Sequence, residues 1–445
     1  MLDKSMPKKL IVAGVGALLL TVPASAEVTG ETAYIFNTLL FLIGGFLVMW
    51  MAAGFAMLEA GLVRSKNVAD ICVKNVALYA LASIMWMLMG YNLMYSGVDG
   101  GYAGTFFSLW NPDDAAALAD GAAHDPSGYS AGSDFFFQMV FVATTASIVS
   151  GTVAERIKLF PFLIFTAVLA GLIYPIQGAW KWGGGWLDAA GFADFAGSTL
   201  VHSTGGWAAL VGAIILGPRL GRYTKEGKVR PMPGSSLPLA TLGTFILWFG
   251  WFGFNGASQL ALGSAADSVA ISNIFVNTNM AAAGGAFAAA IVTKLVYKKV
   301  DLSMVLNGAL AGLVSITAGP DTPLPYQATL IGAVGGVLVV FAVPFFDKLK
   351  IDDVVGAVSV HLVCGIWGTM AVPLTYADAS FGTQALGVVA IGAFVVVTSA
   401  IVWLALKYTV GIRLTDEQEE LGSDLAELGL EAYPEFGRGS QKLSA

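Results

Sequence analysis

Two histidines of this 445-residue chain lie inside apolar stretches, in similar settings. His202 occurs in "VHSTGG" and His361 in "VHLVCG", whereas the third histidine, His124, lies in a polar connection. An imidazole ring can donate and accept a hydrogen bond and can carry a proton near neutral pH. A lone buried histidine is usually a hydrogen-bonded core residue, but two in matching settings favour a functional pair that binds a small donor or passes a proton.

Two other chemistries remain open for such a pair. A metal ion would need further ligands, and no His, Cys, Asp or Glu stands at a suitable spacing, so we expect no metal site. A haem held between His202 and His361 would make the chain a membrane redox protein. The pattern therefore leaves proton handling and haem binding as alternatives, with no cofactor as the primary expectation.

An acid precedes the first of these histidines by eight positions. Residues 193–202 read "ADFAGSTLVH", with Asp194 near the start and His202 at the end. Asp194 could cap the following helix by accepting backbone N–H groups. It could also make the local potential negative and favour a cation there, and the two roles are compatible.

Aromatic residues form a second group of candidates. Trp182 lies in "KWGGGWL", Phe141 in "FVATT", and Trp251, Phe254 and Ser258 in "GWFGFNGAS". Singly, such residues are ordinary interface anchors or core filler. Together they could form a cation site, because a ring face attracts a small cation and a serine hydroxyl can accept its hydrogen bond.

The elements that must position these residues are membrane helices. Hydrophobic residues make up 56% of the chain and charged residues 12%, about half the charged share of a soluble domain. Cys72 and Cys364 both lie in apolar runs, so no disulfide is expected. No nucleophile–base constellation or phosphate-binding loop is apparent, and we expect no enzyme.

The N-terminus has the form of a secretory signal. Basic residues at 4, 8 and 9 precede the apolar run "LIVAGVGALLLTV", and "ASA" follows at 24–26. This order is typical of a cleavable signal peptide over residues 1–26, with an ordinary first membrane helix as the alternative.

Eleven apolar segments of about the length that crosses a bilayer follow the signal. Their predicted limits are 33–58, 71–96, 135–153, 159–179, 199–217, 239–260, 270–293, 303–319, 328–346, 357–376 and 384–408. Lys and Arg cluster in alternate connections, at 64–74, 156–158, 219–230, 294–299 and 348–350, and in the tail, whereas the other connections contain only Lys181. The positive-inside rule then places the mature N-terminus outside and the tail in the cytoplasm, which an odd number of spans satisfies.

The motifs together identify a family resemblance over nearly the whole mature chain. "DFAGSTLVH", "GWFGFNGAS", "AERI" at 154–157 and "VHLVCGIWG" at 360–368 resemble the Amt/Mep/Rh ammonium transporters, in their bacterial Amt branch. The resemblance implies an all-α membrane protein of eleven transmembrane helices, with a five-plus-five inverted repeat and a final helix. It also implies a homotrimer with one pore per subunit, in the bacterial cytoplasmic (inner) membrane.

The resemblance also assigns roles to the candidate residues. Trp182, Phe141 and Ser258 would recruit ammonium, supported by Asp194, and Phe141 and Phe254 would be stacked rings that close the pore. His202, His361 and Trp251 would line a narrow apolar pore. Ammonium can lose a proton on entering such a pore and potassium cannot, because charge is costly in a low dielectric.

We therefore expect electrogenic ammonium uptake, with methylammonium as an analogue. The alternatives are an electroneutral gas channel of the Rh type, an ammonium sensor and the haem protein mentioned above.

The polar, acidic tail completes the predicted organisation. After a membrane domain at 27–410, residues 411–445 contain "RLTDEQEELGSDLAELGLEAYPEFGRG", which begins at Arg413 and includes Tyr433. Composition alone would fit a solvated tail. The resemblance implies a regulatory tail that packs under neighbouring subunits and is read by a PII-type signalling protein.

Overall fold

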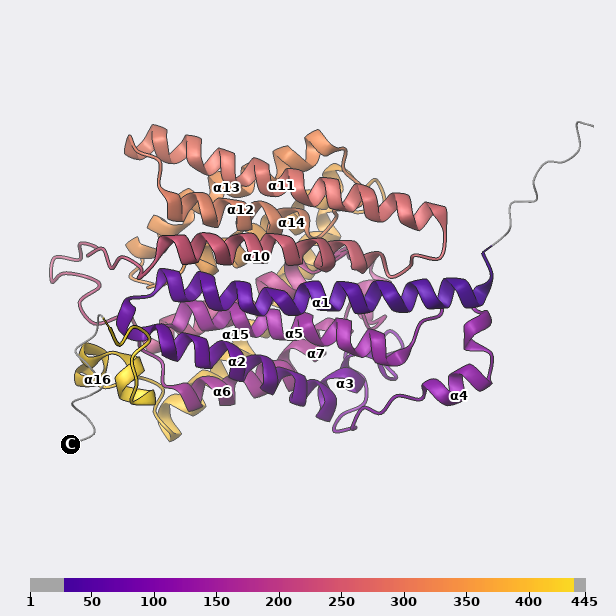
Figure 1. Ribbon diagram of the computed structural model, residues 1–445, viewed down its shortest axis with the longest axis horizontal. Helices are drawn as coiled ribbons and strands as arrows, with labels where there is room; N and C mark the ends of the chain where they lie inside the picture. The colour runs from indigo at the N-terminus through magenta and orange to yellow at the C-terminus, as the bar shows by residue number, and fades with distance from the viewer. Residues whose placement is uncertain (1–27, 436–445) are drawn as a thin grey trace, which may run out of the picture.

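The computed structural model describes residues 28–435 as a bundle of roughly parallel and antiparallel helices (Figure 1). The predicted signal peptide lies outside these residues. No strand occurs within 28–435, apart from two isolated bridges, Ile157 with Arg413 and Tyr223 with Val229. The all-helical membrane architecture predicted from hydropathy is confirmed.

Each predicted apolar segment overlaps one continuous helical run. The runs are α1 (Gly30–Leu62); η1, α2, η2 and α3 (Ser65–Tyr95); α5 (Ala131–Val153); α6, η4 and α7 (Leu159–Ala179); η5 and α9 (Ser198–Leu216); α10 and η6 (Leu237–Gln259); α11 (Ala265–Tyr297); α12 (Leu302–Ile316); α13 (Pro325–Lys348); η7, α14 and η8 (Val358–Leu374); and α15 (Phe381–Thr409). Within 28–435, nine runs are long and apolar enough to cross a membrane, and Leu302–Ile316 and Val358–Leu374 are shorter apolar helices.

Short helices occupy the two ends of the bundle. The connection between α3 and α5 contains α4 (Asp114–Ala119) and η3 (Ala122–His124), and α8 (Trp186–Ala189) precedes η5. We call this the loop end. The opposite, basic end carries the connections rich in Lys and Arg together with α16 (Asp416–Leu421) and η9 (Asp424–Leu428), as Figure 1 shows on the left.

Glycine permits close approach of backbones between the bundle's halves. A Cβ at Gly61 of α1 would lie 2.4 Å from the backbone nitrogen of Ala240 in α10, and one at Gly243 of α10 would lie 2.3 Å from that of Leu58. Small residues allow this contact in membrane helices generally. This close packing holds α10, which carries the buried Trp251 and Phe254, directly against α1.

The described part of the tail is packed against its own chain. Arg413 donates to the carbonyl of Leu216 at 3.0 Å and pairs with Glu419 at 2.8 Å, and Lys66 donates to the carbonyl of Glu419 at 2.7 Å. Tyr433 packs against the small apolar cluster that contains Val68. The solvated-tail alternative therefore does not describe residues 411–435.

Candidate functional site

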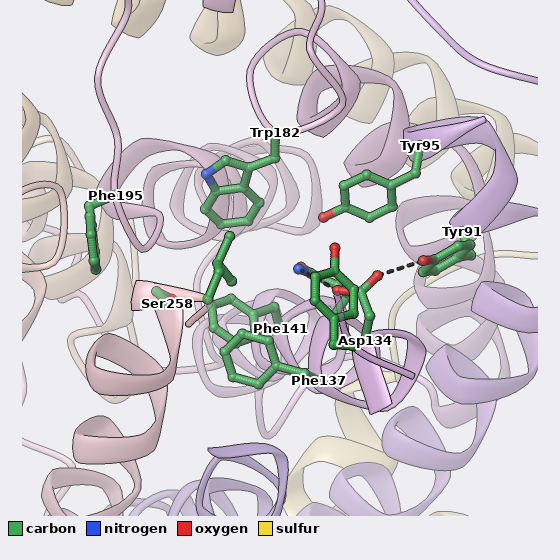
Figure 2. A pocket seen from close by; sticks show the side chains of 11 residues that line it. Tyr91, Tyr95, Asp134, Phe137, Phe141, Trp182, Phe195 and Ser258 are labelled. Carbon is green, nitrogen blue, oxygen red and sulfur yellow. Dashed lines mark hydrogen bonds between the residues drawn. The ribbon is translucent and has the colours of Figure 1, made fainter. Parts of the chain in front are cut away.

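A cavity of about 290 Å³ opens at the loop end, and we call it the vestibule (Figure 2). Three predicted recruitment residues line it: Trp182, Phe141 and Ser258. The Trp182 and Phe141 rings meet edge to face with centroids 6.0 Å apart. The Ser258 hydroxyl donates to the carbonyl of Phe254 at 2.8 Å, so its oxygen remains able to accept a hydrogen bond from a ligand.

Two stacked phenylalanines close the floor of the vestibule. The rings of Phe141 from α5 and Phe254 from α10 lie 4.0 Å apart with an interplanar angle of 24°. Both side chains are buried, at 2% and 0% exposure. The structure thus brings together the two rings that the resemblance paired.

The histidine pair lies directly beyond this stack. His202 stacks on Phe254 at 5.3 Å and on Trp251 at 4.9 Å. The Nδ1 atoms of His202 and His361 are 3.2 Å apart, and both rings are buried. One Nδ1 must donate to the other, so the pair shares a proton and leaves each Nε2 for a partner on its own side.

Trp251 forms part of the wall and is held there by a hydrogen bond. Its indole N–H donates to the hydroxyl of Thr317 at 2.8 Å, and its side chain is fully buried. The ring therefore presents its face to His202.

Asp194 does not line the vestibule. Its carboxylate is buried and accepts backbone N–H groups from Gly197 at 3.1 Å and from Thr199 and Leu200 at 2.9 Å. Burial raises its pKa to about 6, against the lowering effect of these bonds. This is the capping arrangement that the sequence left open. Its carbonyl also accepts the indole N–H of Trp182 at 3.0 Å.

The same device recurs at the second histidine. Asp353 lies eight residues before His361 and accepts from the backbone N–H of Ser359 at 3.0 Å. Gly197 and Gly356 each lie five residues before a histidine, with φ of 103° and 82°, which favours glycine. Both histidines lie on π-helical turns, η5 (Ser198–Ser203) and η7 (Val358–Val363), a form of helix often found at functional sites. The matching turns support the predicted repeat.

The geometry disfavours the metal and haem alternatives. Within residues 28–435, no group of three or more His, Cys, Asp and Glu side chains could hold a metal ion. The 3.2 Å separation of the two Nδ1 atoms is a hydrogen-bond distance and leaves no room for an iron atom between them.

Sequence reasoning missed the acid that does line the vestibule. Asp134 of α5 accepts from the Tyr91 hydroxyl at 2.5 Å and from the Gln138 amide at 3.3 Å, and Tyr95 lines the same cavity (Figure 2). Asp134 stands one residue before the predicted start of the third segment, at 135. The signal in the sequence was an acidic residue directly before an apolar segment.

Comparison with known proteins agrees with these features. Residues 39–433 match the Ammonium Transporter Family. The chain is 41% identical to ammonium transporter Amt2 of Archaeoglobus fulgidus, over 97% of this chain and 96% of that protein. It is also 34% identical to the ammonium transporter of Bacillus subtilis, over 91% and 98% of the two chains.

Two solved structures share the fold. A protein described as "Sensor Amt Protein" superposes with a TM-score of 0.82 at 37% identity, and the match covers 89% of this chain and 99% of that chain. Mep2 of Candida albicans superposes with a TM-score of 0.76 at 27% identity, covering 90% and 92%. The motifs, the fold and the matched length together show that this chain belongs to the ammonium transporter family.

Proposed function

We propose that this chain takes up ammonium by separating it into ammonia and a proton at the phenylalanine stack. The observation that carries the proposal is the order in which three different environments follow one another through the protein. A vestibule with an acid and ring faces leads to two stacked rings and then to a buried histidine pair. Ring faces and carboxylates favour a cation, whereas the apolar passage beyond penalises charge.

The recruitment site consists of Trp182, Phe141 and Ser258, with Asp134 as its negative charge. Asp194 supports the site indirectly, because its carbonyl holds the Trp182 indole and its carboxylate orders the turn that carries His202. Ammonia continues through the pore, and the histidine pair assists transfer of the proton. Uptake is therefore electrogenic.

The charge distribution sets the orientation. By the positive-inside rule the basic end faces the cytoplasm. The vestibule, at the opposite end, therefore opens to the external side of the cytoplasmic membrane. Homotrimer assembly is part of the proposal and is checked by the mass of the purified protein in detergent, from which the detergent contribution has been subtracted.

One experiment tests the transport mechanism. Labelled methylammonium uptake and ammonium-evoked current are measured in proteoliposomes for wild type, His202→Ala and Trp182→Ala. We expect loss of current in the first variant and weaker apparent affinity in the second. Potassium should evoke no current in any of them, and a potassium current as large as that of ammonium would contradict the proposal.

Regulation by a PII-type protein at the tail is a separate proposal. The basic end presents a cavity of about 640 Å³ lined by residues of both the tail and the membrane domain, including Tyr433 and Lys66. Truncation of residues 413–445 should abolish retention of a purified PII protein, and unchanged retention would contradict this role.

A sensor role is the second candidate, favoured by the similarity to the protein described as a sensor. A sensor that does not transport would bind methylammonium without accumulating it inside the proteoliposomes. The uptake assay therefore separates the two.

A further inference from the structure

Glu59 is a buried carboxylic acid within a membrane helix, and the mechanism above does not use it. It lies one turn before the basic end of α1 and is 1% exposed. Ionisable groups inside a membrane are costly and usually have a function. Glu59 follows Phe55 by four residues, about 6 Å along the helix axis, and the Phe55 ring lies 6.2 Å from that of His361.

The partners of Glu59 are neutral. Its Oε2 accepts from the Asn75 amide at 3.0 Å and from the Ser150 hydroxyl at 2.9 Å. The cation on the neighbouring helix, Lys74, is paired with Asp70 at 2.6 Å, with both side chains fully buried. A carboxylate without an ion pair of its own can exist in this position as the anion or as the neutral acid.

Asn75 is a buried donor to Glu59. It is 3% exposed, and its Oδ1 has no hydrogen-bond partner among the described residues. Its Nδ2 donates to Glu59 and also to the carbonyl of Ile71 at 3.0 Å, and these two bonds fix the orientation of the amide.

A small cavity connects Glu59 with the histidine pair. Glu59 and His361 both line it, together with apolar residues and Ser147 and Asn307. It offers about 10 Å³ to the centres of water molecules, close to the space that one buried water requires. The Nδ1 of His361 faces His202, so Nε2 is the ring nitrogen available on the other side.

We infer that Glu59 is the proton acceptor on the cytoplasmic side of the histidine pair. His361 in its protonated form gives the Nε2 proton to a water in this cavity, and that water gives one of its protons to Glu59. The ring becomes neutral, the carboxylate becomes the acid, and Glu59 then releases the proton to cytoplasmic water. The inference rests on the proposed function, because it requires that the proton travels through the histidine pair.

Two assays on purified full-length protein in proteoliposomes test this step. Ammonium-evoked current reports net charge movement, and vesicle alkalinisation by an ammonia gradient reports passage of the neutral gas. For Glu59→Gln we expect the current to fall at least about tenfold, with ammonia permeability within about twofold of wild type. Glu59→Asp, which keeps a carboxylic acid on a shorter side chain, should give an intermediate current.

Ser150→Ala is the matched control, because it removes one hydrogen bond to Glu59 and keeps the carboxylate. We expect its current to stay close to that of wild type. A Glu59→Gln current at the wild-type level overturns the inference. So does a parallel loss of current and ammonia permeability in both Glu59→Gln and Ser150→Ala, because that pattern indicates a purely structural role.

The wild-type measurement separates the two proposals. If wild type takes up methylammonium without current, proton conduction fails and the inference fails with it. If wild type is electrogenic and Glu59→Gln behaves as wild type, only the inference fails.

If Glu59→Gln does not assemble, ammonium-induced infrared difference spectra of wild type and Glu59→Asp test the inference instead. A carboxylic-acid band that shifts in the variant supports the inference, and the absence of such a band overturns it.

Discussion

The two histidine turns are built alike but are anchored in opposite directions. Each has an aspartate eight residues and a glycine five residues before its histidine. Asp194 connects the first turn to the vestibule, because its carbonyl binds Trp182. The second turn begins beside Asp352, whose carboxylate binds Arg219 at 2.8 Å and 3.0 Å at the basic end. The local arrangement of aspartate and glycine is therefore the same at both histidines, and the two turns differ in the neighbours that hold them, Trp182 at the vestibule and Arg219 at the basic end.

The largest expected effect comes from breaking the caps. Asp194 accepts three backbone N–H groups, and a hydrogen bond to a charged acceptor contributes about 1.5–3 kcal/mol. We expect Asp194→Ala to lower initial methylammonium uptake about a hundredfold and Asp353→Ala about tenfold, for equal amounts of folded protein.

The asparagine substitutions are the controls for this pair. Asn keeps one acceptor oxygen, so Asp194→Asn and Asp353→Asn should each retain more uptake than the alanine variant. Wild-type uptake by Asp194→Ala would show that the cap does not position His202.

A smaller effect should separate the vestibule acid from the capping acid. Asp134→Asn removes the negative charge from the cavity that Trp182 lines, and should weaken the apparent ammonium affinity about tenfold, or about 1.4 kcal/mol. The maximal current should change less than twofold, because the pore beyond Phe254 is untouched. Concentration dependence of the current measures both.

Tyr91→Phe is the control for this variant. It removes the hydroxyl that donates to Asp134 and keeps the carboxylate, so a much smaller loss of affinity is expected. An unchanged affinity in Asp134→Asn would indicate that the rings and Ser258 alone attract the cation.

The smallest effect on transport is expected at the anchor of the second turn. Burial alone would raise the pKa of Asp352, but Arg219 holds it well below its usual value. A carboxyl with a lowered folded-state pKa stabilises the fold above its unfolded pKa of about 4, and this contribution is lost as the pH falls through the folded-state pKa.

Thermal unfolding in detergent measures this contribution. Wild type should lose stability as the pH falls below about 4, and Asp352→Asn should be less stable at pH 7 with a weaker dependence on pH over that range. Uptake at neutral pH by the folded variant should change only about twofold, because Asp353 still caps the turn. An unaltered pH dependence would contradict the role of the Asp352–Arg219 pair.

The helices extend beyond the predicted apolar segments where local capping overrides hydropathy. The seventh segment was predicted to begin at 270, but α11 begins at Ala265. Ser264 and Asp267 form a capping box there, which starts the helix in a polar turn. Hydropathy identifies the residues that lipid can surround. It does not identify a polar first turn that begins a helix outside the apolar segment.

The sequence by itself determined the membrane class, the order of the apolar helices, the histidine pair and the aromatic candidates. Long apolar runs and residues such as "DFAGSTLVH" carry that information locally. Only the tertiary structure decided that Asp134 and not Asp194 faces the vestibule, and that Glu59 shares a cavity with His361. Which face of a helix meets which neighbour depends on packing between segments far apart in the chain, and a polar residue within an apolar run does not reveal which way it points.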